Sequence, residues 1–239
     1  MHKVKQAVIL AAGLGKRMSP LTAGIPKPLI RINGVRMIDT AIRGLQANGI
    51  TRIYIVVGWR KEQFTVLTEE YDGITLIENP YYDSCNNISS LYVAREHLED
   101  SVILDGDQFI YNYGILDPLF ALSGYHAVWT ETETGEWLMQ VKNGKVVSCS
   151  RTGGTEGWQL FSISRWSAED GRKLKRHLEE EFEEKRNRQI YWDDVVMFCH
   201  FEEYELGIRE MEPGDVVEVD TIDELIALDD SYGTEGSRK

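Results

Sequence analysis

The stretch "AVILAAGLGKRMSPLTAGIPKPLI", from Ala7 to Ile30, decides the fold of this chain. It begins as a short apolar run typical of a buried strand and then turns through Gly13 and Gly15. Three cationic side chains follow: Lys16, Arg17 and Lys27. Glycines after a strand let the backbone approach a ligand and point successive N–H groups into one concavity, which suits an anion. Arginine can also bind phosphate oxygens through a bidentate pair of N–H groups. The stretch therefore predicts a loop that binds phosphate groups.

The spacing of these residues fits neither of two common nucleotide-binding motifs. A dinucleotide-binding turn has the pattern G-x-G-x-x-G, but Met18 stands where the third glycine is needed. A P-loop has the pattern G-x-x-x-x-G-K-[ST], but Leu10 stands at its first glycine and Arg17 follows Lys16. The glycines alone are equally compatible with a tight β-to-α turn among solvated basic residues. The three cations and the Pro-Lys-Pro element favour a phosphate loop of neither standard type.

Composition places the chain among ordinary globular proteins. Its 239 residues, 42% hydrophobic and 27% charged, suffice for one large domain or two small ones. The net charge of −13 argues against nucleic acid or an anionic membrane as a partner, because both attract positive surfaces. No apolar run approaches the ~18 residues of a membrane span, and no signal-peptide pattern precedes the first strand. Cys85, Cys149 and Cys199 form no C-x-x-C pair, so we expect no disulfide framework or zinc site, and a cytoplasmic protein.

Strand and helix patterns alternate through the first half of the chain. Short β-branched runs predict buried strands at Ala7–Leu10, Ile53–Val57, Ile74–Ile77 and Val102–Leu104. Apolar stripes at helical spacing lie between them, one running from Met37 to Leu45 and another beginning with Phe64 and Leu67. This alternation predicts an α/β fold: a single mixed domain with a Rossmann-like, doubly wound, mostly parallel sheet. We place the domain at residues 1–230 and a flexible tail at 231–239.

The second half of the chain has a different pattern. Two extended runs flank Asn143-Gly144, which predicts an inserted antiparallel hairpin with a type I′ turn. Ser167 and Asp170 predict a capping box for a helix from about Ala168 to Arg186, whose acidic part from Glu179 should be a solvated face. Thr221 and Glu224 predict a second capping box for the last helix. Five histidines are scattered through the sequence, and we expect each to be a surface or core residue: His2, His97, His126, His177 and His200.

Two pairs of carboxylates stand at predicted strand ends. Asp105 and Asp107 follow a buried strand, and Glu218 and Asp220 precede the last helix. Residues two apart in extended chain point to the same side, and ligands of open α/β sheets bind at the carboxyl ends of strands. A turn in which Asp and Gly merely end the strand explains the Asp105-Gly106-Asp107 stretch alone equally well. Together the pairs could hold Mg²⁺, which prefers a few carboxylates with substrate phosphates and water.

These motifs resemble the signature of the nucleotidyltransferases of the pyrophosphorylase type, and in particular the LicC-type phosphocholine cytidylyltransferases. The resemblance runs from about Gln6 to Asp229 and is strongest in "LAAGLGKRMSPLT" and "PKPLI". Weaker matches follow in "NNISSLY", "VILDGDQF", "GEWLMQV", "YWDDVV" and "VEVDTIDEL". It implies a nucleotide-diphospho-sugar transferase-like fold and transfer of CMP from CTP to phosphocholine, giving CDP-choline and pyrophosphate. The acceptor phosphate is already an anion, so it attacks the α-phosphorus in line without a general base.

The resemblance also implies roles for individual residues. The nucleotide would contact the backbone of the first loop, basic side chains and the "NNISS" turn: Ala11, Ala12, Gly13, Gly15, Lys16, Arg17, Asn87, Ser90 and Asp105. Lys27 and Arg17 would act on the triphosphate, and Mg²⁺ would be held by Asp107 and Asp220 with Glu218 close by. The chain departs from the family at Cys85 and Ser89, where the turn more commonly carries tyrosine or phenylalanine.

The acceptor site is implied at Glu136, Trp137, Tyr191 and Asp193. Aromatic faces hold a quaternary ammonium by cation–π attraction. Either Trp137 or Trp192 alone would more often be a core residue, but both lie in segments that match the family, which favours phosphocholine. Carboxylates would suit the primary ammonium of 2-aminoethylphosphonate or phosphoethanolamine. A sugar-1-phosphate nucleotidyltransferase and a catalytically silent nucleotide-binding regulator remain further alternatives. The sequence leaves the oligomeric state open.

Overall fold

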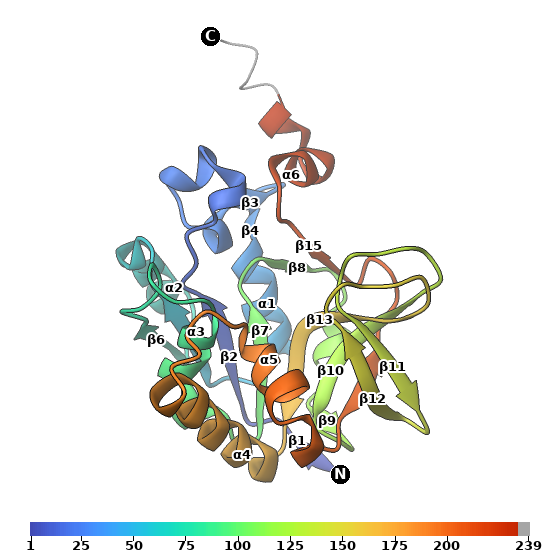
Figure 1. Cartoon of the computed structure of the whole chain (residues 1–239). Coiled ribbons are helices and arrows are strands. Elements are labelled where there is room, and N and C mark those ends of the chain that lie inside the picture. Colours follow the sequence, from blue (N-terminus) through green and yellow to red (C-terminus); the bar gives the residue numbers. More distant parts are fainter. Residues whose placement is uncertain (234–239) are drawn as a thin grey trace.

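A computed structural model describes residues 1–233 and shows a mixed α/β domain around one large sheet (Figure 1). The strand order is β12-β11-β13-β7-β2-β5-β6, with β10 pairing with β13 and β14 beside that path. Four strands form its parallel half: β2 (Gln6–Ala11), β5 (Ile53–Val57), β6 (Ile74–Glu78) and β7 (Ser101–Asp105). The other half holds β10 (Gly124–Thr130), β11 (Leu138–Lys142), β12 (Lys145–Ser150), β13 (Gly157–Trp166) and β14 (Gly207–Glu210). The predicted fold class, a mostly parallel doubly wound sheet with an antiparallel insertion, is confirmed.

Helices cover both faces of the parallel half, because its strands alternate apolar residues between two layers. Ala7 and Ile9 of β2 face a core shared with α1 (Met37–Ala47) and α2 (Thr65–Glu70). Val8 and Leu10 face the opposite core, shared with α3 (Ile88–Val93), α4 (Ala168–Glu179) and α5 (Trp192–Asp194). The carboxyl ends of β2, β5 and β7 therefore rest on a sheet that is buried on both sides, whereas the edge strand β6 is partly exposed, so the prediction of a buried strand there is wrong.

Short paired strands and single turns complete the chain. The two-stranded sheets pair β1 (His2–Lys3) with β9 (Leu119–Phe120), β3 (Arg31–Ile32) with β4 (Val35–Arg36), and β8 (Gln108–Ile110) with β15 (Val216–Glu218). The last α-helix is α6 (Ile222–Leu228). The 3-10 turns are η1 (Lys16–Met18), η2 (Leu21–Ala23), η3 (Lys27–Leu29), η4 (Lys61–Phe64), η5 (Arg95–His97), η6 (Tyr113–Leu116), η9 (Phe201–Glu203) and η10 (Asp230–Gly233), and the π-helical turns are η7 (Glu180–Glu184) and η8 (Val195–Cys199). No helix within residues 1–233 is long and apolar enough to cross a bilayer.

Several local predictions are confirmed in detail. Asn143 and Gly144 have φ angles of 53° and 75°, as a type I′ turn between β11 and β12 requires. At α6 the Thr221 side chain accepts from the Glu224 N–H and the Glu224 side chain accepts from the Thr221 N–H, which is a full capping box. The predicted tail boundary at residue 231 falls within η10, and residues 234–239 lie outside the described part of the chain.

The predicted helix from Ala168 to Arg186 needs three corrections. Ser167 caps α4 by accepting from the Asp170 N–H, but its own N–H donates to Ser123, so only half of the predicted capping box forms. The α-helix ends at Glu179 and continues as the π-helical turn η7. The acidic run is not a wholly solvated face, because Glu181 is 1% exposed and paired with Lys185.

Replacing Gly171 of α4 tests how closely this helix packs against the segment that precedes β7. Alanine in place of glycine inside a helix ordinarily stabilises it by roughly 0.5–1 kcal/mol. A Cβ on Gly171 would lie 2.3 Å from the main-chain oxygen of Leu98. We therefore expect Gly171→Ala to lower the free energy of unfolding by about 1–3 kcal/mol, measured by urea denaturation. Gly44→Ala in α1 is the control, because its Cβ would meet side-chain atoms of Leu116 and Tyr113, which can rotate away. Equal stability changes in the two variants would contradict this account.

Candidate active site

The phosphate loop leaves the carboxyl end of β2 and forms one wall of a cavity of ≈ 390 Å³. Gly13 has open space where a Cβ would be, so a ligand can approach the backbone there. Gly15 has a φ of 61° and accepts a hydrogen bond from the Thr22 hydroxyl at 2.8 Å, which fixes the turn into η1. The loop thus presents backbone and cationic side chains to one side.

Every nucleotide-site residue expected from the sequence lines this cavity. These residues are Ala11, Ala12, Gly13, Gly15, Lys16, Arg17, Lys27, Asn87, Ser90, Asp105, Asp107 and Asp220. Cys85 and Ser89, the departures from the family pattern, also line it. Neither of them lines the second cavity described below, where the acceptor residues expected from the sequence lie.

Two further residues of this cavity, Asn79 and Tyr82, were not expected from the sequence. Asn79 follows β6, is buried, and donates to the hydroxyls of Ser89 and Ser90 at 3.0 and 3.1 Å. It therefore positions the turn that carries Ser90. Its location directly after an apolar strand was the available signal, because ligand-binding residues of α/β sheets follow strands.

Lys27 joins three segments of the chain at the floor of this cavity. Its side chain is held by η3, is 7% exposed, and places Nζ 2.7 Å from Asp107 Oδ2 and 2.8 Å from Asp220 Oδ1. Burial acts to lower the pKa of Lys27, but the two carboxylates outweigh it and raise that pKa above its ordinary value. Arg17 also reaches Asp220 Oδ1 at 2.7 Å. Lys27 is therefore a charged group at neutral pH.

The two carboxylate pairs meet because β8 and β15 pair antiparallel, with Glu218 opposite Gln108. They line a second cavity of ≈ 250 Å³, which shares Arg17, Asn87, Asp105, Asp107 and Asp220 with the first. Burial is the main cause that raises the pKa of Glu218 to about 7 and of Asp193 to about 8, and it raises the pKa of Asp105 well above its ordinary range. This excess of buried carboxylates is a donor set suited to a hard divalent cation or an ammonium group.

All four residues expected to bind the acceptor line the second cavity: Glu136, Trp137, Tyr191 and Asp193. The rings of Trp137 and Tyr191 meet edge to face, with centroids 6.1 Å apart at 87°. Tyr191 is 50% exposed, whereas Trp192 is fully buried against Tyr125 and Trp166 and is a core residue. Tyr191, which caps the start of α5, and Trp192, its first residue, therefore face in opposite directions, and of these two rings only that of Tyr191 lines the cavity.

The second cavity also contains residues that the sequence did not single out. Leu160 and Ser162 of β13 complete its lining. Phe198 of η8 packs on Trp137 with ring centroids 5.3 Å apart, and the Arg151 guanidinium stacks 3.8 Å above Phe198. Arg151 also donates to Asp194 at 2.7 Å, and the Asp194 side chain accepts from the Tyr191 N–H. These contacts hold Trp137 and Tyr191 in place, and no local sequence pattern indicates them.

Replacing Asp193 tests how much stability the chain loses when this buried side chain ionises. The ordinary pKa of aspartate is near 4, so the folded chain holds this proton more tightly and loses stability as pH rises from about 4 to 8. Asp193→Asn removes this loss. We expect the variant to unfold at a higher temperature than the parent at pH 8.5, by the equivalent of at least ~1 kcal/mol, with little difference near pH 4. Asp72→Asn, at an exposed position after α2, is the control. If the two proteins differ in unfolding temperature by the same amount from pH 4 to pH 8.5, the pKa of Asp193 is not raised in the folded chain.

Comparison with known proteins shows the family to which this chain belongs. Residues 7–189 match the family model of the MobA-like NTP transferase domain. A 2-aminoethylphosphonate cytidylyltransferase of Lancefieldella rimae is 39% identical over 229 residues, which cover 95% of this chain and 92% of that protein. A choline-phosphate cytidylyltransferase of Streptococcus pneumoniae is 31% identical over 225 residues, covering 94% and 97%.

Comparison with solved structures also finds cytidylyltransferases. The CTP:phosphocholine cytidylyltransferase of Streptococcus pneumoniae (LicC) superposes with a TM-score of 0.88 at 32% identity, covering 96% of this chain and 99% of that one. An inositol-1-phosphate CTP transferase of T. maritima, with a TM-score of 0.77 at 17% identity, shares the fold. The phosphate loop, the joined cavities and these similarities together show that the chain belongs to the MobA-like NTP transferase family and is a nucleotidyltransferase of the cytidylyltransferase group.

Proposed function

We propose that this enzyme transfers CMP from CTP to a small acceptor that carries a phosphonate or phosphate at one end and an ammonium at the other, with 2-aminoethylphosphonate as the preferred acceptor. One observation supports this choice most directly. Asp193 is buried in the wall of the second cavity, and burial raises its pKa to about 8 although the Tyr125 hydroxyl and its own main-chain N–H act to lower it. A buried carboxylate with so few donors is costly, and a bound N–H group would relieve that cost.

The chemistry of the two ammonium types distinguishes the acceptors. A primary ammonium has three N–H donors, whereas a trimethylammonium has none. Asp193, Glu136 and Glu218 line the cavity as acceptors, with only Arg17 as a cationic side chain among its lining residues. The similarity to a protein named 2-aminoethylphosphonate cytidylyltransferase supports the same choice.

Phosphocholine is the second candidate, and the sequence favoured it. Trp137 and Tyr191 offer ring faces at the same cavity, and cation–π contact with each ring contributes about 0.5–2 kcal/mol. The relatives named choline-phosphate cytidylyltransferase support this alternative. The rings and the carboxylates could each orient the cation, so the ranking of the two acceptors rests on the buried carboxylate of Asp193.

The proposed reaction needs positioning and charge neutralisation rather than a general base. An anionic oxygen of the acceptor attacks the α-phosphorus of CTP, and the bond from that phosphorus to the bridging oxygen breaks as pyrophosphate leaves. Lys16 and Arg17 lie beside the phosphate loop, where they would counter the charge that builds on pyrophosphate. No histidine lines either cavity among the described residues. Anchoring of the acceptor's ammonium by Asp193 would direct its other end toward Lys27 and the phosphates.

Mg²⁺ is the cofactor that we propose, and the residues present fit it. Asp107 and Asp220 would hold the ion, with Glu218 and Asp105 nearby, and the bound ion would supply positive charge at the phosphates. Lys27 holds Asp107 and Asp220 together from one side, so both carboxylates are in position beforehand.

The metal proposal predicts a steep loss of activity when either carboxylate is neutralised. Asp107→Asn and Asp220→Asn should remain folded and lose at least ~100-fold in kcat, because each removes a charge that stabilises the transferred phosphates. EDTA should abolish wild-type turnover, measured by pyrophosphate release, and added Mg²⁺ should restore it. Asp72→Asn should behave as wild type. Full turnover in EDTA would refute the cofactor.

The acceptor proposal predicts a preference that mutation can reverse. Wild-type kcat/KM with CTP should be at least ~10-fold higher for 2-aminoethylphosphonate than for phosphocholine. Asp193→Asn should lower it ~10-fold or more for 2-aminoethylphosphonate, because a hydrogen bond to a charged group contributes about 1.5–3 kcal/mol. Trp137→Leu should impair phosphocholine more, because it removes the ring face and keeps much of the apolar volume.

The acceptor assay should also include phosphoethanolamine and glucose 1-phosphate. A higher kcat/KM for phosphocholine in the wild type would establish the ring faces as the main determinant. Turnover of glucose 1-phosphate alone would refute an ammonium-bearing acceptor, and no pyrophosphate release with any acceptor would favour a silent nucleotide-binding protein.

A further inference from the structure

Arg165 of β13 is a buried cation that has no acidic partner. The cationic side chains buried within residues 1–233 are those of Lys27, Arg36 and Arg165. Lys27 and Arg36 each form ion pairs with two carboxylates. Arg165 forms none in the described chain, and the one hydrogen bond that its side chain makes there is to the main-chain oxygen of Ile115. A buried charge without an opposite charge is costly.

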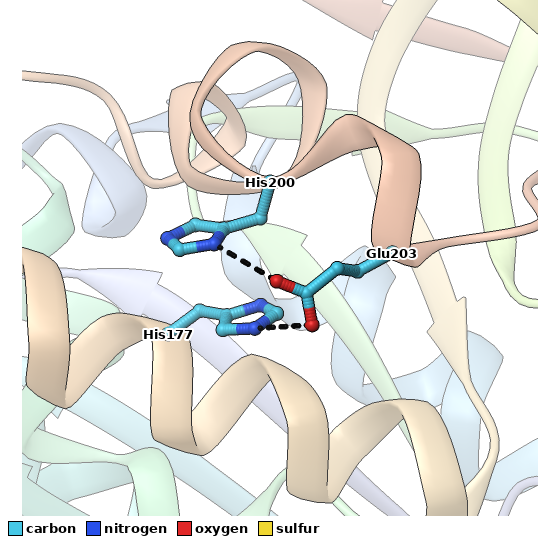
Figure 2. A group of neighbouring side chains, drawn as sticks. All are labelled: His177, His200 and Glu203. Carbon is cyan, nitrogen blue, oxygen red and sulfur yellow. Dashed lines mark hydrogen bonds and ion pairs between the residues drawn. The ribbon is translucent and has the colours of Figure 1, made fainter.

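The stacked histidines show how this chain places carboxylates beside other basic groups. His177 of α4 and His200, which follows η8, have ring centroids 3.9 Å apart and planes 4° apart (Figure 2). Glu203 of η9 lies beside both rings, and Glu181 lies 3.0 Å from His200 Nε2. Carboxylates therefore lie against these rings, whereas none within residues 1–233 pairs with Arg165.

A second guanidinium, that of Arg209 in β14, converges on the same main-chain oxygen. Arg209 Nη1 lies 3.5 Å from the Ile115 oxygen, and its Nη2 donates to the Leu119 oxygen at 2.6 Å. His126 Nε2 is also 3.0 Å from the Ile115 oxygen, so several nitrogens share one acceptor. Each guanidinium has five N–H donors, of which Arg165 uses one and Arg209 two within the described residues. Most of these donors therefore remain for a ligand or water.

Both guanidinium groups are charged at neutral pH, although their surroundings oppose the charge. Burial and the neighbouring Arg209 lower the pKa of Arg165 to about 9, and burial also lowers the pKa of Arg209. Asp117 acts to raise both pKa values, but it forms no ion pair with either arginine in the described chain. Carbonyl oxygens satisfy N–H donors without supplying a negative charge. The protein itself therefore leaves this positive centre uncompensated.

The two arginines line a third cavity, of ≈ 280 Å³. The rest of its lining consists of glycines, apolar side chains and Tyr125, and none of its lining residues is acidic. Arg209 is partly exposed, so an ion can reach it from solvent. In a chain with a net charge of −13, a cavity whose charged lining residues are two arginines is suited to an anion.

This third cavity lies toward the end of the sheet that is away from the active site. Arg165 pairs with Val102 near the start of β7, whereas Asp105 at the end of β7 lines both the first and the second cavity. The third cavity shares no lining residue with either of them. An anion bound here would therefore leave the active site free.

We propose that Arg165 and Arg209 form a binding site for a small, multiply charged oxyanion of the phosphate class, separate from the phosphate loop. Guanidinium groups bind phosphate oxygens through paired N–H donors, and two of them match an anion that carries about two negative charges. The cavity is smaller than the ~300–1,000 Å³ of sites for organic ligands, so the ion itself fits better than a nucleotide. The bound anion would neutralise both cations and raise the unfolding temperature of the chain.

The test is equilibrium dialysis of radiolabelled orthophosphate against the whole chain at constant ionic strength. The variant Lys16→Gln/Arg17→Gln serves as the background protein, because it removes two exposed cations from the phosphate loop. We expect this protein to bind one phosphate per chain and to unfold at a higher temperature when phosphate is present. Adding Arg209→Gln should weaken phosphate binding at least ~10-fold and abolish that rise, because charge-assisted hydrogen bonds to the anion are lost.

Matched variants and competing anions separate this site from general attraction to positive charge. Arg52→Gln, which removes an exposed arginine elsewhere, should bind phosphate as the background protein does. Arg165→Gln should act as Arg209→Gln does, and the partly exposed Arg209 keeps the test informative if Arg165→Gln misfolds. Sulfate and pyrophosphate should compete with phosphate, whereas acetate, with one charge, should not. Loss of all phosphate binding in the background protein, equal affinity with and without Arg209→Gln, or equal competition by acetate would overturn the proposal.

Discussion

The ion pairs between Lys27 and the carboxylates of Asp107 and Asp220 organise the active site. They join the phosphate-loop region, the turn after β7 and the turn before α6, three segments that are distant in the sequence. Because the ammonium is buried, removing Lys27 would leave two carboxylates without their counter-ion, and breaking a buried pair costs about 3–5 kcal/mol in comparable sites. The first and second cavities meet at these carboxylates, so one interaction fixes the relative position of both.

Around this centre the chain accumulates more negative charge than its own cations neutralise. Glu218, Asp193 and Asp105 all have pKa values raised by burial, with neighbouring carboxylates adding to the effect. In a protein with a net charge of −13, this is unfavourable for folding. The same excess would serve the proposed function, in which the site holds a metal ion and an ammonium beside a triphosphate. The site is therefore less stable without its ligands than a neutral core would be.

The acceptor wall depends on packing that extends away from the chemistry. Trp137 is supported by Phe198, Phe198 by Arg151, and Arg151 by its bond to Asp194. The stacked histidines and Glu181 hold the other end of the same segment. Small changes in α4 or η9 can thus reach Asp193 and Tyr191 through contiguous contacts rather than through the sheet.

The sequence by itself determined those features that depend on neighbouring residues. Strand periodicity located β2, β5, β6 and β7, the Asn143-Gly144 turn located the hairpin, and Thr221 with Glu224 located α6. Glycine and cation spacing singled out the loop after β2, which lines the first cavity, and paired carboxylates at strand ends singled out residues that line the second cavity. These signals are local because backbone conformation and side-chain direction follow from residues a few positions away.

Tertiary structure alone decided which side chains meet. The turn of α5 places Trp192 in the core and Tyr191 at the cavity, although both are aromatic and adjacent. Glu181 lies in an acidic run that predicts solvent exposure, yet it is buried because Lys185, Asn187 and His200 satisfy it. His177 stacks on His200 only because α4 packs beside η8 and η9. Partners of this kind come from segments that folding brings together, and no spacing within one segment encodes them.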